Sequence, residues 1–339
     1  MHIRNNIKSL LPYSTARDEY QGGDISVWLD ANESPYDNGV NRYPDPHQKE
    51  LKCVIAQLKG VQPEQVFIGN GSDEAIDLCF RIFCEPGVDN VVAIAPTYGM
   101  YSVAAAINNV QVKEVSLVDD TYELDVEAML HAVDEHTRLM WVCSPNNPTG
   151  NAFTLMQLEH LATHFDGVLV VDEAYIDFSD KGSMLSVLSQ HPNVVVLQTL
   201  SKAWGMAGLR LGLAFASPEV AALFARVKYP YNVNGPTQRE VMQRLTNEPH
   251  DAHVAEIIRE RKALSEALLA ASCVACVYPS DANFLLIKVH DADALYDHLV
   301  KQGIIVRNRH RVRGCENCLR LTIGTPDENQ RLLQAIQTF

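Results

Sequence analysis

Lys202 stands where a buried strand is expected to end, and it is the side chain in this sequence best suited to covalent chemistry. It follows the apolar run VVVLQTLS at 194–201. A lysine is rarely buried unless it is paired or reactive, and its ammonium group loses its charge readily when desolvated. A neutral lysine amine attacks a carbonyl carbon to form a Schiff base. Arg210 follows after glycines and small residues, and arginine binds phosphate or carboxylate. The two residues predict a site for a carbonyl compound that carries an anionic group.

Polar side chains follow five apolar runs of the chain, each at the point where a strand is expected to end. They are Ser72 and Asp73 after 66–69, Tyr98 after 93–96, Asn147 after 141–145, Asp172 and Tyr175 after 168–171, and Ser201 and Lys202 after 194–200. Because ligands bind at the carboxyl ends of the strands in an open parallel sheet, we expect these side chains to face one crevice.

Taken one at a time, these positions have simpler explanations. Residues 71–73 resemble a helix N-cap, residues 147–150 a turn, and residues 172–173 a solvated loop. Two carboxylates directly after a buried strand are costly if they are buried and unpaired. Five such strand ends together therefore indicate a binding site rather than five unrelated loops.

Pyridoxal 5′-phosphate is the ligand whose chemistry matches this set of side chains. Its aldehyde suits the amine of Lys202, and its pyridinium nitrogen suits the carboxylate of Asp172. Asparagine and tyrosine side chains suit the ring oxygen, and an aromatic residue suits the flat face of the ring. A helix N-terminus, a serine and Arg210 suit the phosphate group. The residues by themselves therefore predict an enzyme that uses this cofactor, and they leave its substrate open.

The hydrophobic pattern predicts the elements that position these residues. Short runs rich in Val, Ile and Leu alternate with helical patterns between about residues 60 and 230, which indicates an α/β fold with a mostly parallel sheet between helices. Beyond residue 250, an amphipathic helix over 251–271 is followed by strands at 283–289, 303–308 and 318–324, a helix at 291–303, and a last helix capped by Thr325 and Glu328. This second part predicts a smaller α+β unit. We expect an N-terminal arm over 1–42, a large domain over 43–240 and a small C-terminal domain over 241–339.

Charge and hydropathy narrow the class of protein. The chain of 339 residues has 28 basic and 42 acidic side chains, a formal net charge of −14. This balance argues against nucleic acid or an anionic membrane as a partner, since both need a basic face, and it leaves a small anionic substrate open. The first twenty residues contain no apolar core of a signal peptide, and no run approaches the roughly 20 apolar residues of a membrane helix. We expect a cytoplasmic protein with reduced thiols.

Two CxxC pairs, Cys273/Cys276 and Cys315/Cys318, are units that a four-thiolate zinc site would use. The gap between the pairs is longer than in a typical zinc ribbon. The run 273–278 also has the pattern of a strand, in which residues three apart point to opposite faces. We therefore expect ordinary buried or edge cysteines, and no metal.

Three motifs in this order and spacing resemble those of a known superfamily. SPNNPTG at 144–150, DEAY at 172–175 and TLSKAWGMAGLRLG at 199–212 resemble the fold-type I, aspartate-aminotransferase-like enzymes that use pyridoxal 5′-phosphate. LDANESP at 29–35, NRYPDP at 41–46, GNGSDEAID at 69–77, PTYGMY at 96–101 and CLRLTIGT at 318–325 are similar to motifs of the histidinol-phosphate aminotransferases. The resemblance extends from about Leu11 to the last helix.

The resemblance implies a role for each cofactor-binding residue. Lys202 would bond to the aldehyde carbon and move the proton, with Asp172 on the pyridinium nitrogen. Asn147 and Tyr175 would bind the ring 3′-oxygen, and Tyr98 would stack on the ring. The cofactor phosphate would be held by Ser72, Asp73 (through backbone N–H groups), Ser201 and Arg210, and by Tyr43 of the other subunit in a homodimer.

The resemblance also implies the substrate site, which Tyr13, Asn32, Arg307 and Arg320 would line. The stretch RNRHRVRGCENC at 307–318 is more basic than this family leads us to expect. We interpret Arg309, Arg311 and Arg313 as a solvated face.

The implied reaction is reversible transfer of an amino group between L-histidinol phosphate and 2-oxoglutarate, giving imidazole-acetol phosphate and L-glutamate in histidine synthesis. The same residues would also serve an aromatic aminotransferase or a decarboxylase acting on threonine phosphate. A regulatory or binding protein on the same fold is the alternative outside enzymes. Release of glutamate, release of carbon dioxide, and the bleaching of a yellow chromophore by an amine would distinguish these classes.

Overall fold

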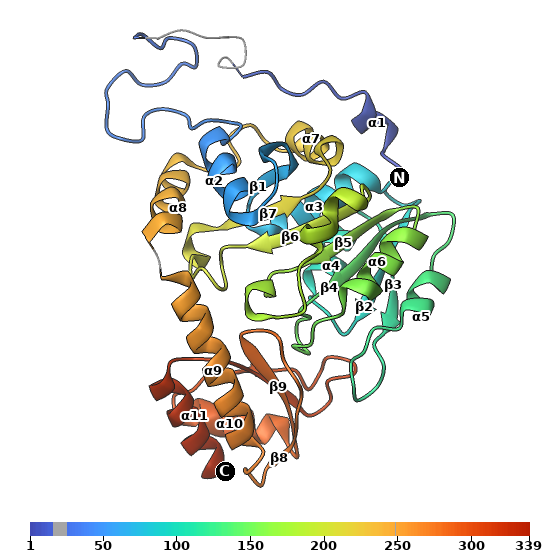
Figure 1. The fold of residues 1–339 in the computed structure, drawn as a ribbon, viewed down its shortest axis with the longest axis vertical. Coiled ribbons are helices and arrows are strands. Elements are labelled where there is room, and N and C mark those ends of the chain that lie inside the picture. The colour runs from blue at the N-terminus through green and yellow to red at the C-terminus, as the bar shows by residue number, and fades with distance from the viewer. Residues whose placement is uncertain (16–25, 248) are drawn as a thin grey trace.

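The computed structural model describes residues 1–15, 26–247 and 249–339. Its larger sheet consists of β1 (Val66–Asn70), β2 (Asn90–Ala95), β3 (Gln111–Ser116), β4 (Thr137–Cys143), β5 (Val168–Asp172), β6 (Val194–Thr199) and β7 (Leu211–Phe215). The strand order is β1-β7-β6-β5-β4-β2-β3 (Figure 1). Parallel pairing links β3, β2, β4, β5 and β6, which confirms the mostly parallel sheet. Strand β7 is the exception, because it runs antiparallel to both β6 and β1.

The strands are apolar on both faces, and helices cover both. In β4, Met140 and Val142 enter one core while Leu139 and Trp141 enter the other, as expected when successive side chains of a strand point to opposite faces. Helices α2 (Lys49–Lys59), α5 (Val126–His131), α6 (Leu155–His164) and α8 (Gly235–Asn247) contribute to the first core, and α3 (Ser72–Phe83), α4 (Met100–Ile107) and α7 (Pro218–Val227) to the second. This arrangement leaves the carboxyl ends of the parallel strands as the open edge of the sheet.

The C-terminal part has a second sheet of four antiparallel strands. They are β8 (Val274–Val277), β9 (Phe284–Val289), β10 (Arg307–Asn308) and β11 (Cys318–Thr322), in the order β10-β11-β9-β8. Helices α9 (His250–Leu268), α10 (Ala292–Lys301) and α11 (Pro326–Gln337) pack against one face of this sheet. The expected strand at 303–308 is shorter than predicted, since only its last two residues pair. The capping box of Thr325 and Glu328 is confirmed.

The opposite face of the small sheet packs against the larger part of the chain. Leu286 and Tyr278 join the first core, and the Tyr278 ring lies 4.9 Å from the ring of Tyr122. The Tyr122 hydroxyl donates a hydrogen bond of 2.6 Å to the carbonyl oxygen of Gly314. These contacts place β10 and β11 beside the open edge of the large sheet.

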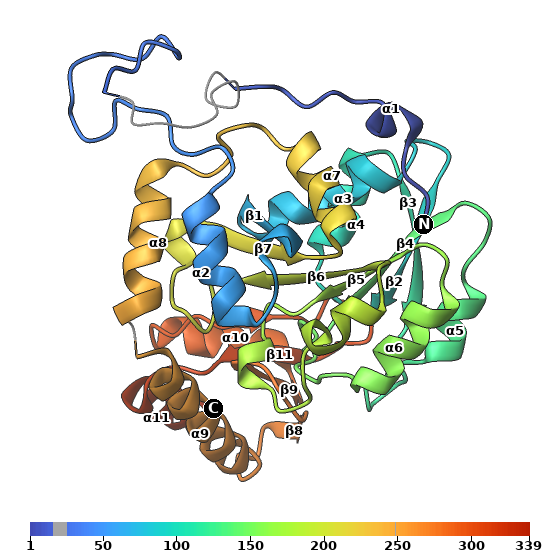
Figure 2. The same ribbon diagram turned by 45° about the horizontal axis from the view of Figure 1, so that its top comes forward.

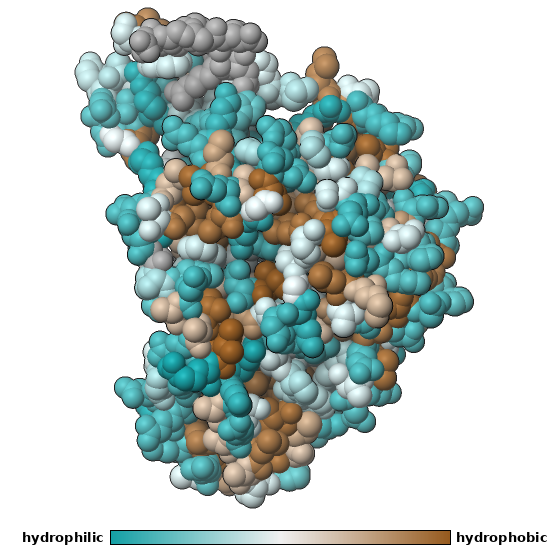
Figure 3. Space-filling model, in the orientation of Figure 1, coloured by the Kyte–Doolittle hydropathy of each residue, from teal (hydrophilic) through white to brown (hydrophobic). Residues whose placement is uncertain are grey.

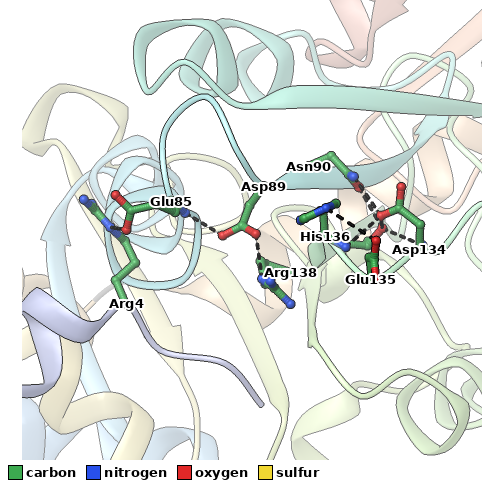
Figure 4. A network of polar contacts seen from close by, with 9 residues as sticks. Arg4, Glu85, Asp89, Asn90, Asp134, Glu135, His136 and Arg138 are labelled. Atoms are coloured by element: carbon green, nitrogen blue, oxygen red, sulfur yellow. Dashed lines mark hydrogen bonds and ion pairs between the residues drawn. The ribbon is translucent and has the colours of Figure 1, made fainter.

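The other end of the large sheet is held by polar contacts (Figure 4). The short helix α1 (Asn5–Lys8) starts beside Arg4, whose guanidinium lies 3.1 Å from the carboxylate of Glu85. The buried carboxylate of Asp89, directly before β2, accepts a hydrogen bond of 2.9 Å from Nε of Arg138 in β4. This network joins the starts of two neighbouring strands at the end opposite to the open edge.

Residues 26–42 are irregular, and most of this segment lies away from the body in both ribbon views (Figures 1 and 2). The chain then returns to the body, where Tyr43 stacks on Tyr231. Hydrophilic and apolar side chains are interspersed over the face drawn in Figure 3. Within the described ranges, no helix has both the length and the apolar character needed to cross a bilayer. The two sheets fall within the predicted domains at 43–240 and 241–339, and the domain boundaries themselves stay predictions.

Candidate active site

A cavity of about 390 Å³ opens at the carboxyl ends of the parallel strands, where the small sheet meets the large one. The predicted residues that line it are Ser72, Asp73, Tyr98, Asn147, Asp172, Tyr175, Ser201, Lys202, Arg210, Arg307 and Arg320. The expectation that five strand ends face one crevice is therefore confirmed. Cys143, Ala174, Thr199, Ala207 and Arg309 complete the lining, and the sequence analysis did not place them there.

Lys202 lies in the turn after β6 and is exposed to this cavity. Its Nζ atom lies 5.6 Å from the centre of the Tyr175 ring. The surrounding walls remove water from the ammonium group, and this desolvation, with the positive charge of Arg320 second, lowers the pKa of Lys202. Asp172 opposes the shift. The neutral amine needed for attack on a carbonyl is thus easier to form here than on a surface lysine.

Asp172 ends β5 as a fully enclosed carboxylate, 3% exposed. The Tyr101 hydroxyl donates to its Oδ2 at 2.6 Å, and the backbone N–H of Ala174 donates to its Oδ1 at 3.1 Å. Burial raises the pKa of Asp172, and these two hydrogen bonds oppose that rise. A cation against this carboxylate would offset the remaining cost of its burial.

Tyr101 was missed by the sequence analysis, although it touches Asp172 directly. It lies three residues after Tyr98 and its ring meets that of Tyr98 edge-on at 5.6 Å. Tyr98 precedes helix α4, and Tyr101 lies in the first turn of that helix. Its nearness to Tyr98 in PTYGMY was the available sequence signal.

One end of the cavity is suited to an anion. Helix α3 begins at Ser72, and no side chain caps its N-terminus at Gly71. Gly71 has φ 75°, and a Cβ there would lie 2.6 Å from Nη2 of Arg210. Arg210 is itself left-handed, with φ 52°, and its guanidinium lies 3.5 Å from the Asp73 carboxylate. The backbone conformation therefore brings a helix N-terminus and a guanidinium together, a pairing that binds phosphate.

The small sheet adds a second set of cations to the lining of the cavity. Arg307 on β10 and Arg320 on β11 are direct cross-strand partners. Nη1 of Arg320 donates to Oδ1 of Asn147 at 2.5 Å, and its guanidinium lies 5.1 Å from the ring centre of Phe284. Burial lowers the pKa of Arg320. A strand of the small sheet thus positions an asparagine of the large part.

The basic loop is only partly solvated. Arg311 and Arg313 are exposed, as predicted, but the interpretation of Arg309 as part of the solvated face was wrong. Arg309 is half-buried and lines the cavity. The reason is its register, since its backbone N–H donates to the carbonyl of Cys318 at 2.9 Å and so extends the pairing of β10 with β11.

Three predicted residues lie outside this cavity in the single chain. Tyr13 is 73% exposed, and Asn32 has φ 54° in the arm. Tyr43 is 48% exposed and stacks on Tyr231 with ring centres 4.4 Å apart. All three precede helix α2 in the chain, and their assigned roles stay predictions.

The cysteines of the CxxC pairs are free thiols. Cys315 and Cys318 are buried, whereas Cys273 and Cys276 are half-buried on and beside β8. In the part of the chain that the structure describes, no group of three or more His, Cys, Asp or Glu side chains is arranged to hold a metal ion.

Comparisons with known proteins identify relatives over nearly the whole chain. The family model of aminotransferase class I and II matches residues 16–336. A histidinol-phosphate aminotransferase of Parabacteroides distasonis is 54% identical over 338 residues, covering 99% of this chain and 97% of its own. One from Bacteroides thetaiotaomicron is 51% identical, with coverage of 99% and 97%. The solved structure of the Sinorhizobium meliloti enzyme in complex with pyridoxal 5′-phosphate has a TM-score of 0.81 at 24% identity, covering 88% of this chain and 82% of that one. The Sinorhizobium meliloti structure therefore has the same fold as this chain.

Proposed function

The chain belongs to the class I and II aminotransferase family, and from this premise we propose that it exchanges the amino group of L-histidinol phosphate with 2-oxoglutarate. The products are imidazole-acetol phosphate and L-glutamate, a step in histidine synthesis. The protein is a transferase that depends on pyridoxal 5′-phosphate and acts on small molecules.

The observation that carries this proposal is that two groups of cationic residues line one cavity together with Lys202. Arg210 and the N-terminus of α3 form one group, and Arg307 and Arg320 form the other. The cofactor contributes one phosphate, so the second group is available for the anion of a substrate. A phosphorylated amine fits this requirement, and so does the side-chain carboxylate of glutamate.

The residues present fit the cofactor. Gly71 leaves room for Arg210 where any Cβ would collide, and the uncapped start of α3 supplies N–H donors for a phosphate. Ser201 adds a hydroxyl, which accepts a hydrogen bond from Thr199 at 2.9 Å. The buried carboxylate of Asp172 suits a pyridinium nitrogen. We assign Asn147 and Tyr175 to the ring oxygen, and Tyr98 to the face of the ring, by the same family resemblance.

When bound, the cofactor supplies an aldehyde that takes up the amine nitrogen and a ring that accepts an electron pair. Lys202 Nζ lines the cavity and would be the base that removes the proton from the amine-bearing carbon of the substrate. Its lowered pKa favours the neutral amine that this task needs. Asp172 would hold the pyridinium nitrogen of the cofactor, and Arg320 would orient the substrate anion. Arg320 also fixes Asn147 by a hydrogen bond.

We further propose a homodimer in which Tyr43 contributes to the partner's site. In the described part of the N-terminal region, apolar side chains are exposed, among them Leu11 at 87% and Leu29 at 88%. Mixing a Tyr43→Phe protein with a Lys202→Ala protein tests the arrangement. One site of the mixed dimer then has both changes and the other has neither, so activity should exceed that of either parent. No gain, with subunit exchange verified by mass spectrometry, would contradict a shared site.

The assay for the function offers L-histidinol phosphate and 2-oxoglutarate and follows glutamate. Glutamate formation at a kcat/KM well above that for tyrosine or phenylalanine supports the proposal over an aromatic aminotransferase. Carbon dioxide from threonine phosphate, without glutamate, would identify a decarboxylase instead. We also propose a cytoplasmic location, where the free thiols of the described chain stay reduced. Cell fractionation tests that assignment.

A further inference from the structure

Three arginines project from the same face of the small sheet at the substrate end of the cavity. Arg307 and Arg320 are directly opposite each other on β10 and β11. Arg309 lies two residues beyond Arg307, and its backbone pairs with Cys318, two residues before Arg320. Because side chains alternate between faces along a strand, Arg309 shares the face of the other two. All three line the cavity.

This arrangement costs free energy unless an anion binds there. Like charges directly opposite each other in a sheet are destabilising. Within the described residues, none of the three guanidiniums forms an ion pair with a carboxylate, and Nε of Arg309 is buried without a hydrogen-bond partner. Burial, followed by the charges of Arg320 and Arg307, lowers the pKa of Arg309 to about 10. A buried donor without a partner is expensive, so the site is built to receive an acceptor.

The anion in question is distinct from the cofactor phosphate. The charges that act most on Arg309 are those of Arg320, Arg307, Cys315 and Tyr175, whereas Arg210 pairs with Asp73 at the other end. A phosphate monoester carries close to two negative charges at neutral pH and three acceptor oxygens, which matches three guanidiniums better than one carboxylate does.

From this convergence of three arginines on one face, we infer that Arg309 is a specificity-determining residue that binds the phosphate of the amine substrate, an inference that rests on the proposed function. Arg320 and Arg307 serve any substrate anion, and Arg309 adds the contact that favours a phosphate over a carboxylate.

The loop that carries Arg309 does not depend on its side chain. Its backbone is held by the Cys318 carbonyl, the Asn308 amide donates to the carboxylate of Asp293 at 2.6 Å, and the Tyr122 hydroxyl holds Gly314. Truncation of Arg309 should therefore leave the loop in place. Arg311, exposed in the same loop, is a matched control with the same charge.

The experiment compares the cofactor-loaded wild type, Arg309→Ala, Arg309→Lys and Arg311→Ala with three amine donors: L-histidinol phosphate, unphosphorylated L-histidinol and L-glutamate. Arg309→Ala should lower kcat/KM for the phosphorylated amine roughly ten- to a hundredfold, mostly through KM, and change the other two less than about threefold. Arg309→Lys should recover part of the loss, since it keeps the charge but loses the planar fork. Arg311→Ala should match wild type.

Thermal unfolding of the same loaded proteins adds a readout without turnover. Inorganic phosphate should raise the Tm of wild type more than that of Arg309→Ala, and in its absence Arg309→Ala should be no less stable than wild type because a repelling charge has been removed.

The outcomes separate this inference from the proposed function. If wild type does not use L-histidinol phosphate at all, the proposed function fails. If wild type uses it and Arg309→Ala lowers all three donors by one factor, or lowers none, the assignment of Arg309 is overturned while the function stands. A loss of Tm without phosphate would identify a structural role and would likewise overturn it.

Discussion

Replacing Tyr101 by phenylalanine removes one oxygen from the active site and tests how Asp172 works. The Tyr101 hydroxyl donates to Asp172 at 2.6 Å, and both groups are buried. The ring should stay in place, because it also stacks on Trp141 at 4.8 Å. After the change, the backbone N–H of Ala174 is the hydrogen-bond donor that Asp172 keeps.

The size of the effect follows from the charge on the acceptor. A hydrogen bond to an ionised group contributes about 1.5–3 kcal/mol, and 1.4 kcal/mol is about tenfold in rate. If Asp172 acts as the anion beside the ring nitrogen, kcat should fall by roughly ten- to a hundredfold while KM changes little. Asp172→Asn removes the charge itself, so its kcat should fall further than that of Tyr101→Phe.

The pH profile gives a second, independent check. The hydrogen bond from Tyr101 lowers the pKa of Asp172 against the effect of burial, as does the charge of Lys202, whereas the charge of Asp73 raises it. Loss of the hydroxyl therefore raises the pKa of Asp172, and the carboxyl stays protonated to a higher pH. The acid limb of the kcat profile should shift to higher pH. The loss of kcat relative to wild type should therefore be largest at acid pH and smaller at basic pH.

The measurements are kcat and KM across pH and the affinity for pyridoxal 5′-phosphate by equilibrium dialysis. Wild-type kcat, an unmoved acid limb and cofactor affinity within twofold of wild type would together refute the role assigned to the Tyr101–Asp172 pair. Unchanged circular dichroism would show that a loss is not one of folding.

Further changes test the nucleophile, a buried carboxyl and the far end of the sheet. Lys202→Ala should bind the cofactor without a covalent bond, so borohydride treatment and dialysis should leave wild type labelled and the variant unlabelled; a labelled variant would contradict the assignment. Burial raises the pKa of Glu173 to about 7, from about 4.5 when exposed, so its native carboxyl holds a proton that the unfolded chain releases, and stability should fall as pH rises between those values. Glu173→Gln should remove about 3 kcal/mol of that pH dependence in urea unfolding, and an equally steep dependence in the variant would argue against the shift. Asp89→Asn weakens the hydrogen bond from Arg138 at the opposite end of the sheet, so it should cost about 1.5–3 kcal/mol of stability and leave kcat unchanged; a kcat loss with intact stability would be unexpected.

The sequence alone determined the elements of the large sheet and the residues at its open edge. Uninterrupted runs of Val, Ile and Leu form strands that are buried on both faces. The polar residues directly after such a run lie at the end of its strand, and this placement does not depend on the rest of the fold. For this reason the sequence predicted the positions of Asp172 and Lys202. The capping box at Thr325 was also predictable, because a cap is a contact between residues three apart.

Tertiary structure decided what the local pattern does not encode. The direction of β7 was one such feature, since an apolar run has the same periodicity whether its strand runs parallel or antiparallel. The environments of Arg309 and Arg311 were another: the two residues lie in one basic stretch, yet only Arg309 turns toward the cavity, because pairing with Cys318 sets its register. The hydrogen bond from Tyr101 on α4 to Asp172 at the end of β5 was a third, since 71 residues separate the two in the chain. In each case the deciding contact joins residues of different segments, and the local sequence pattern does not specify which residues of separate segments meet.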